Sequence, residues 1–132
     1  MNVTGTKNLI DLALQNKIKT FIYSSSASVY GEPNYLPCDE KHPLKPLSPY
    51  ASTKLEAEKL FETDKISRSN MNVIILRYFN PISSDPQSII GEKSNDKTNN
   101  VMNEIHEVAI GRKDIFSIFG NNYPTNDGTC IR

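Results

Sequence analysis

Short apolar runs that alternate with helix-like stretches constrain the fold of this chain more than any other feature. The apolar runs are 21–23, 73–76 and 115–119. Apolar residues recur at helical spacing in 3–14, 50–61 and 101–109. Alternation of helices with short buried strands is typical of a parallel sheet with right-handed crossovers. We therefore predict an α/β fold, in which a parallel sheet has flanking helices.

Proline and serine predict where the central helix begins. The prolines within 33–49 are incompatible with a helix and predict a surface loop. Ser48 is suited to cap the helix that follows, and Pro49 is suited to its first turn. We expect this helix to fray near Lys65. Pro81 is expected to end the second strand.

Polar residues follow the apolar part of two predicted strands. Residues 24–26 are three serines after the first strand, and residues 78–80 are Tyr-Phe-Asn after the second. The carboxyl ends of parallel strands lie at one edge of a sheet, and ligands of such sheets bind beyond that edge. The sequence therefore predicts a binding site where these two segments converge.

Charge and hydropathy favour a small-molecule partner over nucleic acid or a membrane. The 15 basic and 15 acidic residues cancel, and no basic stripe is present. The longest aliphatic run, 73–76, is far shorter than the roughly 20 apolar residues of a membrane span. No signal-peptide pattern is seen, so we expect a cytoplasmic protein. Cys38 and Cys130 lack metal-ligand spacing and are interpreted as structural thiols, with no metal site.

Tyr50 and Lys54 lie one helical turn apart and can face the same ligand. A free phenol has a pKa of about 10, so it needs roughly 3 to 4 kcal/mol of electrostatic help to act as a base near neutral pH. A lysine ammonium and a cationic nicotinamide ring could supply that help in a desolvated cleft. Ser26 could then hold the reacting hydroxyl and relay its proton. The same spacing also occurs on solvated helix faces, so the pair alone does not define a site.

Five segments together resemble the extended short-chain dehydrogenase/reductase family and, within it, the UDP-glucose 4-epimerases. They are NVTGT at 2–6, FIYSSSASVYG at 21–31, SPYASTK at 48–54, LRYFNP at 76–81 and IFGNNYPTNDGTCIR at 118–132. The resemblance implies a Rossmann-type fold, tightly held NAD and often a homodimer. It also implies reversible oxidation at C4 of UDP-glucose or UDP-galactose through a 4-keto intermediate, as part of galactose metabolism.

The resemblance also assigns roles to individual residues. It implies that Tyr50 takes the proton of the 4-hydroxyl, that Lys54 hydrogen-bonds the nicotinamide ribose, and that Ser26 completes the catalytic group. The implied cofactor contacts are Ser26, Tyr50, Lys54 and Phe79. The implied substrate contacts are Ser26, Tyr50, Asn80, Asn100, Ile118, Phe119 and Arg132. Alternatively, the aromatic and aliphatic members of these sets are packed strand residues, and Asn100 is a helix cap.

The glycines depart from the family pattern. The six glycines include no set spaced for the GxxGxxG turn that binds a dinucleotide pyrophosphate. The family carries that turn before the matching segment and carries further substrate-binding residues after it. The resemblance therefore implies that residues 1–132 form a single partial domain with a partial Rossmann-type parallel sheet. We expect this domain to be the catalytic middle of an epimerase, inactive as an isolated chain. A partial sheet would expose an apolar edge, which predicts association or poor solubility.

Two other interpretations stay open. One is a non-catalytic product of a truncated gene. The other is a sugar-nucleotide 4,6-dehydratase, whose elimination of water requires an acid and a base after the strand-end serine or threonine. Residues 27–29 are Ala-Ser-Val and offer no carboxylate, which argues against this second interpretation.

Overall fold

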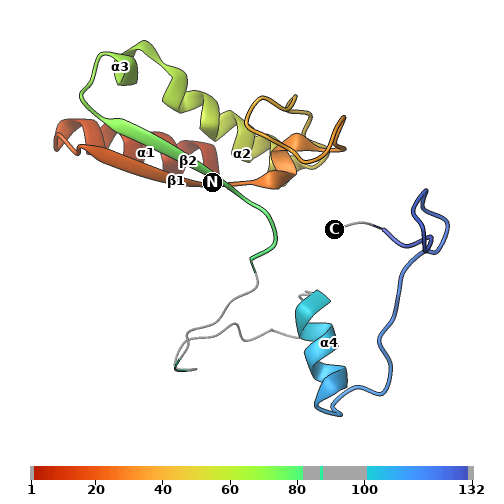
Figure 1. Cartoon of the computed structure of the whole chain (residues 1–132). Coiled ribbons are helices and arrows are strands. Elements are labelled where there is room, and N and C mark those ends of the chain that lie inside the picture. The colour runs from red at the N-terminus through yellow and green to blue at the C-terminus, as the bar shows by residue number, and fades with distance from the viewer. Residues whose placement is uncertain (1, 82–86, 88–100, 131–132) are drawn as a thin grey trace. The chain divides into compact units, whose positions relative to one another are not determined.

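The computed structural model describes residues 2–81, 87 and 101–130 (Figure 1). The chain divides into two compact units, Met1–Pro81 and Ile82–Arg132, and each is described by itself. The single partial domain predicted from the sequence stays a prediction.

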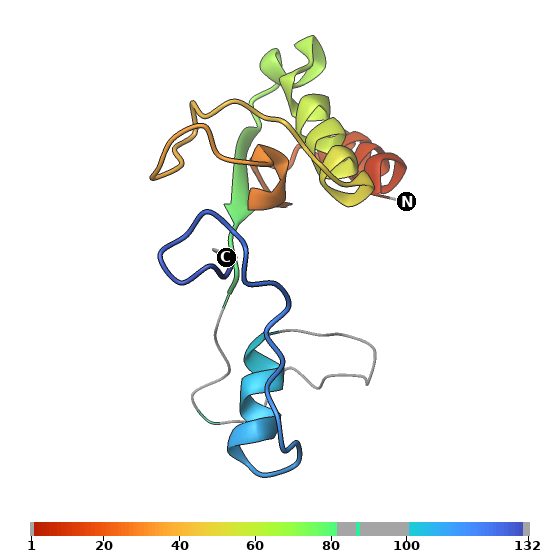
Figure 2. The same cartoon turned by 90° about the vertical axis from the view of Figure 1, so that its right-hand side faces the viewer.

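In the first unit, two parallel strands are covered on one face by two helices that lie side by side (Figures 1 and 2). The helices are α1 (Asn2–Gln15) and α2 (Pro49–Lys59), and the strands are β1 (Thr20–Ser26) and β2 (Asn72–Tyr78). The short helical segments are η1 (Ala27–Tyr30), η2 (Leu60–Glu62) and α3 (Asp64–Ser67). This arrangement agrees with the α/β fold predicted from the alternating pattern.

The parallel register brings the two predicted binding segments to one edge. Thr20 pairs with Asn72 at one end of the ladder, and Ser26 pairs with Tyr78 at the other. The chain leaves both strands at this second end, with η1 following Ser26. The expected convergence of the serine run with the residues after β2 is therefore confirmed.

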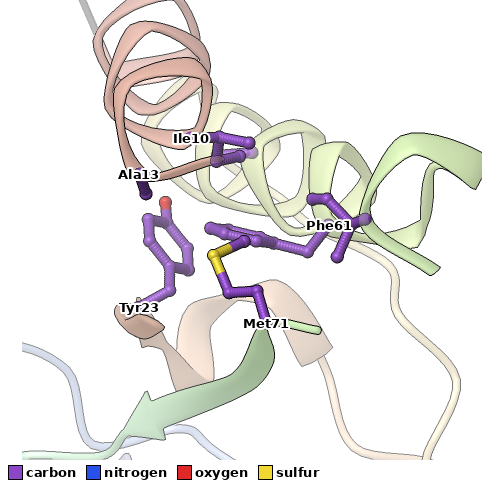
Figure 3. Packing of buried hydrophobic residues seen from close by; sticks show 7 residues of the cluster. Ile10, Ala13, Tyr23, Phe61 and Met71 are labelled. Atoms are coloured by element: carbon purple, nitrogen blue, oxygen red, sulfur yellow. The ribbon is translucent and has the colours of Figure 1, made fainter. Parts of the chain in front are cut away.

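The hydrophobic core lies between the helices and the inner face of the sheet (Figure 3). Phe61 is central to it, because its ring centroid lies 5.2 Å from the centroids of both Phe21 and Tyr23. The outer face of the sheet also carries apolar side chains, and Ile22 and Ile74 there are 59% and 45% exposed. The apolar edge expected for a partial sheet, and the association expected to follow from it, stay predictions.

The Tyr23 hydroxyl is buried without a hydrogen-bond partner among the described residues. A buried polar group of this kind lowers stability by the cost of removing it from water. Replacing Tyr23 with Phe is therefore expected to leave the free energy of unfolding unchanged or to raise it by about 1 kcal/mol. Urea unfolding followed by circular dichroism measures this, and a loss above about 1 kcal/mol would show that the hydroxyl has a partner.

The predicted loop between η1 and α2 is irregular and is organised around His42. The imidazole is 2% exposed and packs against the rings of Tyr30 and Tyr35, with centroid distances of 5.4 and 4.6 Å. Its Nε2 accepts a hydrogen bond from the Asn34 amide at 2.9 Å, so Nδ1 is the nitrogen that donates to the Pro43 carbonyl at 2.9 Å. His42 thus holds the loop through backbone groups.

Tyr35 in this loop donates a hydrogen bond to the Asp39 carboxylate at 2.7 Å. This bond raises the pKa of Tyr35 from 10.0 to about 12, and it lowers the pKa of Asp39. The bond therefore supports the folded loop up to about pH 10, and this support is lost as the pH rises through about 12. Because the pKa of Asp39 is lowered, the support is also lost as the pH falls through that pKa.

Replacing Asp39 with Ala is expected to lower the pKa of Tyr35 from about 12 toward 10.0, because the hydrogen-bond acceptor and its negative charge are removed while the smaller effect of burial remains. Phenolate absorbance during an alkaline titration measures this, with Tyr35→Phe identifying the contribution of that residue. Glu40→Ala is the matched control and should leave the titration unchanged. A Tyr35 that still titrates near 12 in the Asp39 variant would contradict the stated cause.

The central helix ends earlier than predicted. Ser48 and Pro49 begin α2 as expected, but the α-helix stops at Lys59 and not near Lys65. Thr63 has an extended backbone, with φ −79° and ψ 150°, and separates η2 from the one-turn helix α3. The predicted second strand is confirmed as β2, and Pro81 follows it by three residues.

In the second unit, the predicted helix over 101–109 is confirmed as α4 (Val101–Ala109). The strand predicted over 115–119 is wrong, since these residues have no regular secondary structure. A strand requires a neighbouring strand for its backbone hydrogen bonds, and the sheet of the described residues contains β1 and β2 alone. In the described part of the chain, no helix is long and apolar enough to cross a membrane.

Candidate functional site

Ser26 is the point at which β1 ends and η1 begins. Its backbone is extended, and its Oγ accepts a hydrogen bond from the Ser28 amide at 3.2 Å. The two hydroxyl oxygens, Ser26 Oγ and Ser28 Oγ, are 2.9 Å apart. Successive strand side chains point to opposite faces, so Ser25 is buried beneath α2 while Ser24 is exposed. The serine run therefore presents Ser26 at the edge of the sheet.

The start of α2 places Tyr50 in the first helical turn. Ser48 has an extended backbone, and its Oγ accepts a hydrogen bond from the Ala51 amide at 3.1 Å. Pro49 occupies the first turn of the helix. Backbone N–H groups there have no partner within the helix, so the missing N–H of proline costs no hydrogen bond. Tyr50 is 52% exposed, so its phenol is open to a ligand.

Lys54 connects this helix to the end of β1. Its Nζ donates a hydrogen bond to the Ser24 carbonyl at 2.9 Å. The same nitrogen lies 5.2 Å from the ring centroid of Tyr23 and 5.7 Å from that of Tyr50, within the range of cation–π attraction. The structure thus brings Lys54, and with it the Tyr50 ring, to the backbone of β1 two residues before Ser26.

Phe79 and Asn80 directly follow β2 at the same edge. Phe79 is 64% exposed, and its ring is stacked near that of Tyr30 with a centroid distance of 6.3 Å. Asn80 is exposed. Beside them is a cleft of about 540 Å³ whose described lining consists of Tyr30, residues 38–40 and residues 75–79.

The remaining predicted contacts stay predictions. Asn100 and Arg132 lie outside the described residues. Ile118 and Phe119 belong to the second unit and are 64% and 80% exposed. Among the residues that the structure describes, no group of three or more potential metal ligands is present, and Cys38 and Cys130 are free thiols.

Sequence reasoning missed a buried ion pair beneath the site. Glu58 is 2% exposed, accepts a hydrogen bond from Ser25 Oγ, and is bound by the Arg77 guanidinium through Nε at 3.2 Å and a second nitrogen at 2.8 Å. This hydrogen bonding raises the pKa of Arg77 above its usual value. The sequence did contain a signal for this ion pair. Glu58 lies next to Ala57 on the buried side of a helix, and a buried carboxylate requires a partner.

Comparison with protein families identifies the chain. A family model described as GDP-mannose 4,6 dehydratase matches residues 1–132. The chain belongs to this family of NAD-dependent epimerases and dehydratases. Membership confirms the resemblance to the extended short-chain dehydrogenase/reductases that five sequence segments predicted.

Within the family, similar proteins are UDP-glucose 4-epimerases. The curated enzyme of Dictyostelium discoideum is 43% identical over 131 residues, which are 99% of this chain and 38% of that protein. The crystal structure of the Brucella ovis enzyme in complex with NAD has a TM-score of 0.84 and 36% identity, covering 98% of this chain and 39% of that one. The Bifidobacterium longum enzyme, in complex with NAD⁺ and UDP, has a TM-score of 0.83 and 31% identity, covering 97% and 38%.

These likenesses confirm the Rossmann-type α/β fold. This chain spans about two fifths of the length of the curated relatives that it matches, since it covers 38% of the Dictyostelium protein.

Proposed function

We propose that residues 1–132 supply the catalytic segment of a UDP-glucose 4-epimerase, which interconverts UDP-glucose and UDP-galactose with NAD. The observation that supports this most directly is the Lys54 ammonium, bound at the carboxyl end of β1 and facing the Tyr50 ring. Ser26 lies at the same edge, where ligands of parallel sheets bind. A phenol, an ammonium and a hydroxyl are the groups that proton transfer from a sugar hydroxyl requires.

The described residues fit the nicotinamide end of the cofactor. Lys54 has three N–H donors and gives one to Ser24, so its ammonium can also reach a ribose hydroxyl. The exposed Phe79 ring offers an apolar contact at the same edge. When bound, NAD supplies hydride transfer at C4 of the sugar. The glycines of this chain form no pyrophosphate turn, so the other end of the cofactor would be held by residues outside this segment.

The side chains divide the proton transfer between them. Tyr50 would act as the general base that takes the proton from the 4-hydroxyl when C4 is oxidised. Ser26 hydrogen-bonds the same hydroxyl and orients it toward Tyr50. In the return step, Tyr50 would act as the general acid that gives the proton back to the oxygen on C4. The other proposed substrate contacts are Asn80, Asn100, Ile118, Phe119 and Arg132.

The name of the matching family model supports a second candidate, a sugar-nucleotide 4,6-dehydratase. Elimination of water would require a carboxylic acid close to Ser26. Residues 27–29 provide none, and the carboxylate of Glu58 is already engaged by Ser25 and Arg77. We therefore favour the epimerase. Homodimer formation and a cytoplasmic location also stay predictions.

A chimaeric enzyme tests the proposal. Residues 1–132 replace the matching 38% of the Dictyostelium discoideum epimerase, and conversion of UDP-galactose to UDP-glucose is followed by chromatography. We expect epimerisation by the chimaera and none by the isolated chain. Accumulation of a 4-keto-6-deoxy sugar would support the dehydratase instead. A soluble, NAD-loaded chimaera that converts nothing would support a non-catalytic chain.

A further inference from the structure

A buried polar cluster, formed by Ser25, Tyr30, Glu58 and Arg77, joins the elements that carry the candidate catalytic residues. Ser25 lies in β1 one position before Ser26, and Tyr30 ends η1. Glu58 lies on α2, and Arg77 lies on β2 directly opposite Ser25 in the sheet register. The cluster therefore contacts both strands, η1 and the central helix.

Helix α2 is tied to β1 at two points that lie one helical turn apart. Lys54 donates a hydrogen bond to the Ser24 carbonyl, and four residues later the Glu58 carboxylate accepts a hydrogen bond from the Ser25 hydroxyl. Residues four apart share one helix face, while the two serines are adjacent in the strand. Both bonds can therefore form only when α2 lies at one position along β1. Sliding α2 by one turn, about 5.4 Å, would break both of them.

Arg77 extends the same restraint to η1. Its guanidinium binds both carboxylate oxygens of Glu58, with Nε donating to Oε1 and Nη2 donating to Oε2, which fixes direction as well as distance. Another guanidinium nitrogen, Nη1, donates a hydrogen bond to the Tyr30 hydroxyl at 3.3 Å, and the guanidinium carbon lies 5.1 Å from the Tyr30 ring centroid. The segment that follows Ser26 is thus held to the same carboxylate as α2.

The energetics of buried ion pairs favour a geometric role for the cluster. The side chains of Arg77 and Glu58 are 19% and 3% exposed, so both charges are largely removed from water. Loss of hydration offsets much of the attraction in such a pair, and apolar residues of similar volume are often equally stabilising. What the ion pair adds is a directional connection between three elements.

We propose that the buried polar cluster is a positioning device, which holds Tyr50 and Lys54 on α2 in register with Ser26 at the end of β1. Glu58 and Arg77 are positioning residues, since they act through other side chains. The importance of this alignment for catalysis rests on the proposed function. The alignment of α2 with β1 itself does not depend on that proposal.

Amide hydrogen exchange of the purified chain tests this proposal. Ser25→Ala removes one of the two ties between α2 and β1, the bond to Glu58. It leaves the Lys54 bond and the ion pair in place, so it is a mild change. We expect exchange at the amides of Ser28, Gly31 and Ser52 to become about tenfold faster or more, because a hydrogen bond to a charged acceptor is lost. Exchange within α1 should change by less than about twofold. Glu58→Gln should produce the same local pattern.

Ser69→Ala is the matched control. Like that of Ser25, the Ser69 hydroxyl makes hydrogen bonds, donating to the Ile66 carbonyl at 2.7 Å and accepting from the Met71 amide at 3.3 Å. Ser69, however, precedes β2 at the end of the sheet far from the site. The Ser69→Ala substitution should leave hydrogen exchange at the amides of Ser28, Gly31 and Ser52, the reporter amides, unchanged. Equal acceleration in α1 and α2, or no acceleration at the reporter amides, would overturn the positioning role.

The chimaera then separates the two proposals. Ser25→Ala there should lower kcat about tenfold with KM unchanged, since substrate binding groups are kept while their alignment with the base is loosened. A local exchange effect with an inactive chimaera would overturn the proposed function and leave the positioning role standing. An unchanged kcat in an active chimaera would overturn the catalytic part of the inference.

Discussion

In the active chimaera, replacing Tyr50 with Phe is expected to lower kcat by about 10²- to 10⁴-fold with little change in KM. The substitution removes only the hydroxyl, so the ring remains beside Lys54 and the sugar can still bind. Without the phenol oxygen, no group on α2 is placed to take the proton of the 4-hydroxyl. A loss confined to kcat is the result expected when an interaction made in the transition state is removed.

Progress curves at several UDP-galactose concentrations measure this, together with the NAD content of each purified variant. Tyr35→Phe is the control, because Tyr35 lies in the loop and contacts Asp39 and His42. It should retain the kcat of the parent. A Tyr50 variant that is NAD-loaded and keeps more than about a tenth of the parent kcat would show that another group acts as the base.

The second large effect is on stability. Replacing Phe61 with Ala is expected to lower the free energy of unfolding of the chain by about 3 to 5 kcal/mol. Phe61 is 6% exposed, and its ring packs between Phe21 and Tyr23. Truncation removes buried apolar surface and leaves a cavity that the surrounding strands and helices fill only in part.

Urea unfolding followed by circular dichroism measures this loss. Phe79→Ala is the matched control, since the 64% exposed ring should contribute less than about 0.5 kcal/mol. Phe61→Leu keeps most of the volume and gives a smaller loss if the alanine variant does not fold. A loss below about 1 kcal/mol in Phe61→Ala would mean that the core does not depend on this ring.

The two effects are connected through one continuous segment. Phe61 follows α2 directly and anchors that end of the helix in the core, while Tyr50 lies in the first turn at the opposite end. Lys54 and Glu58 lie between them and bind β1. Conditions that loosen the core are therefore expected to disturb the site before the chain unfolds.

Local chemistry in the sequence determined most of the secondary structure. The apolar periodicity predicted α1 and α4, and the pair Ser48-Pro49 predicted where α2 begins, because caps and first-turn prolines act within a few residues. Where the outcome depended on a neighbour, prediction failed. Residues 115–119 have the composition of a strand, but a strand exists only when another strand accepts its hydrogen bonds.

The geometry of the candidate site was decided by the tertiary structure. The sequence predicted that Tyr50 and Lys54 share a helix face, since four residues make one turn. It did not predict that Lys54 would bind the Ser24 carbonyl, or that Glu58 and Arg77 would pair beneath Ser25. Those contacts join residues 19 to 33 positions apart. They form only once the core has placed α2 against the paired strands. The residues next to a charged side chain in the sequence do not indicate its partner, so these contacts could not be predicted from the sequence.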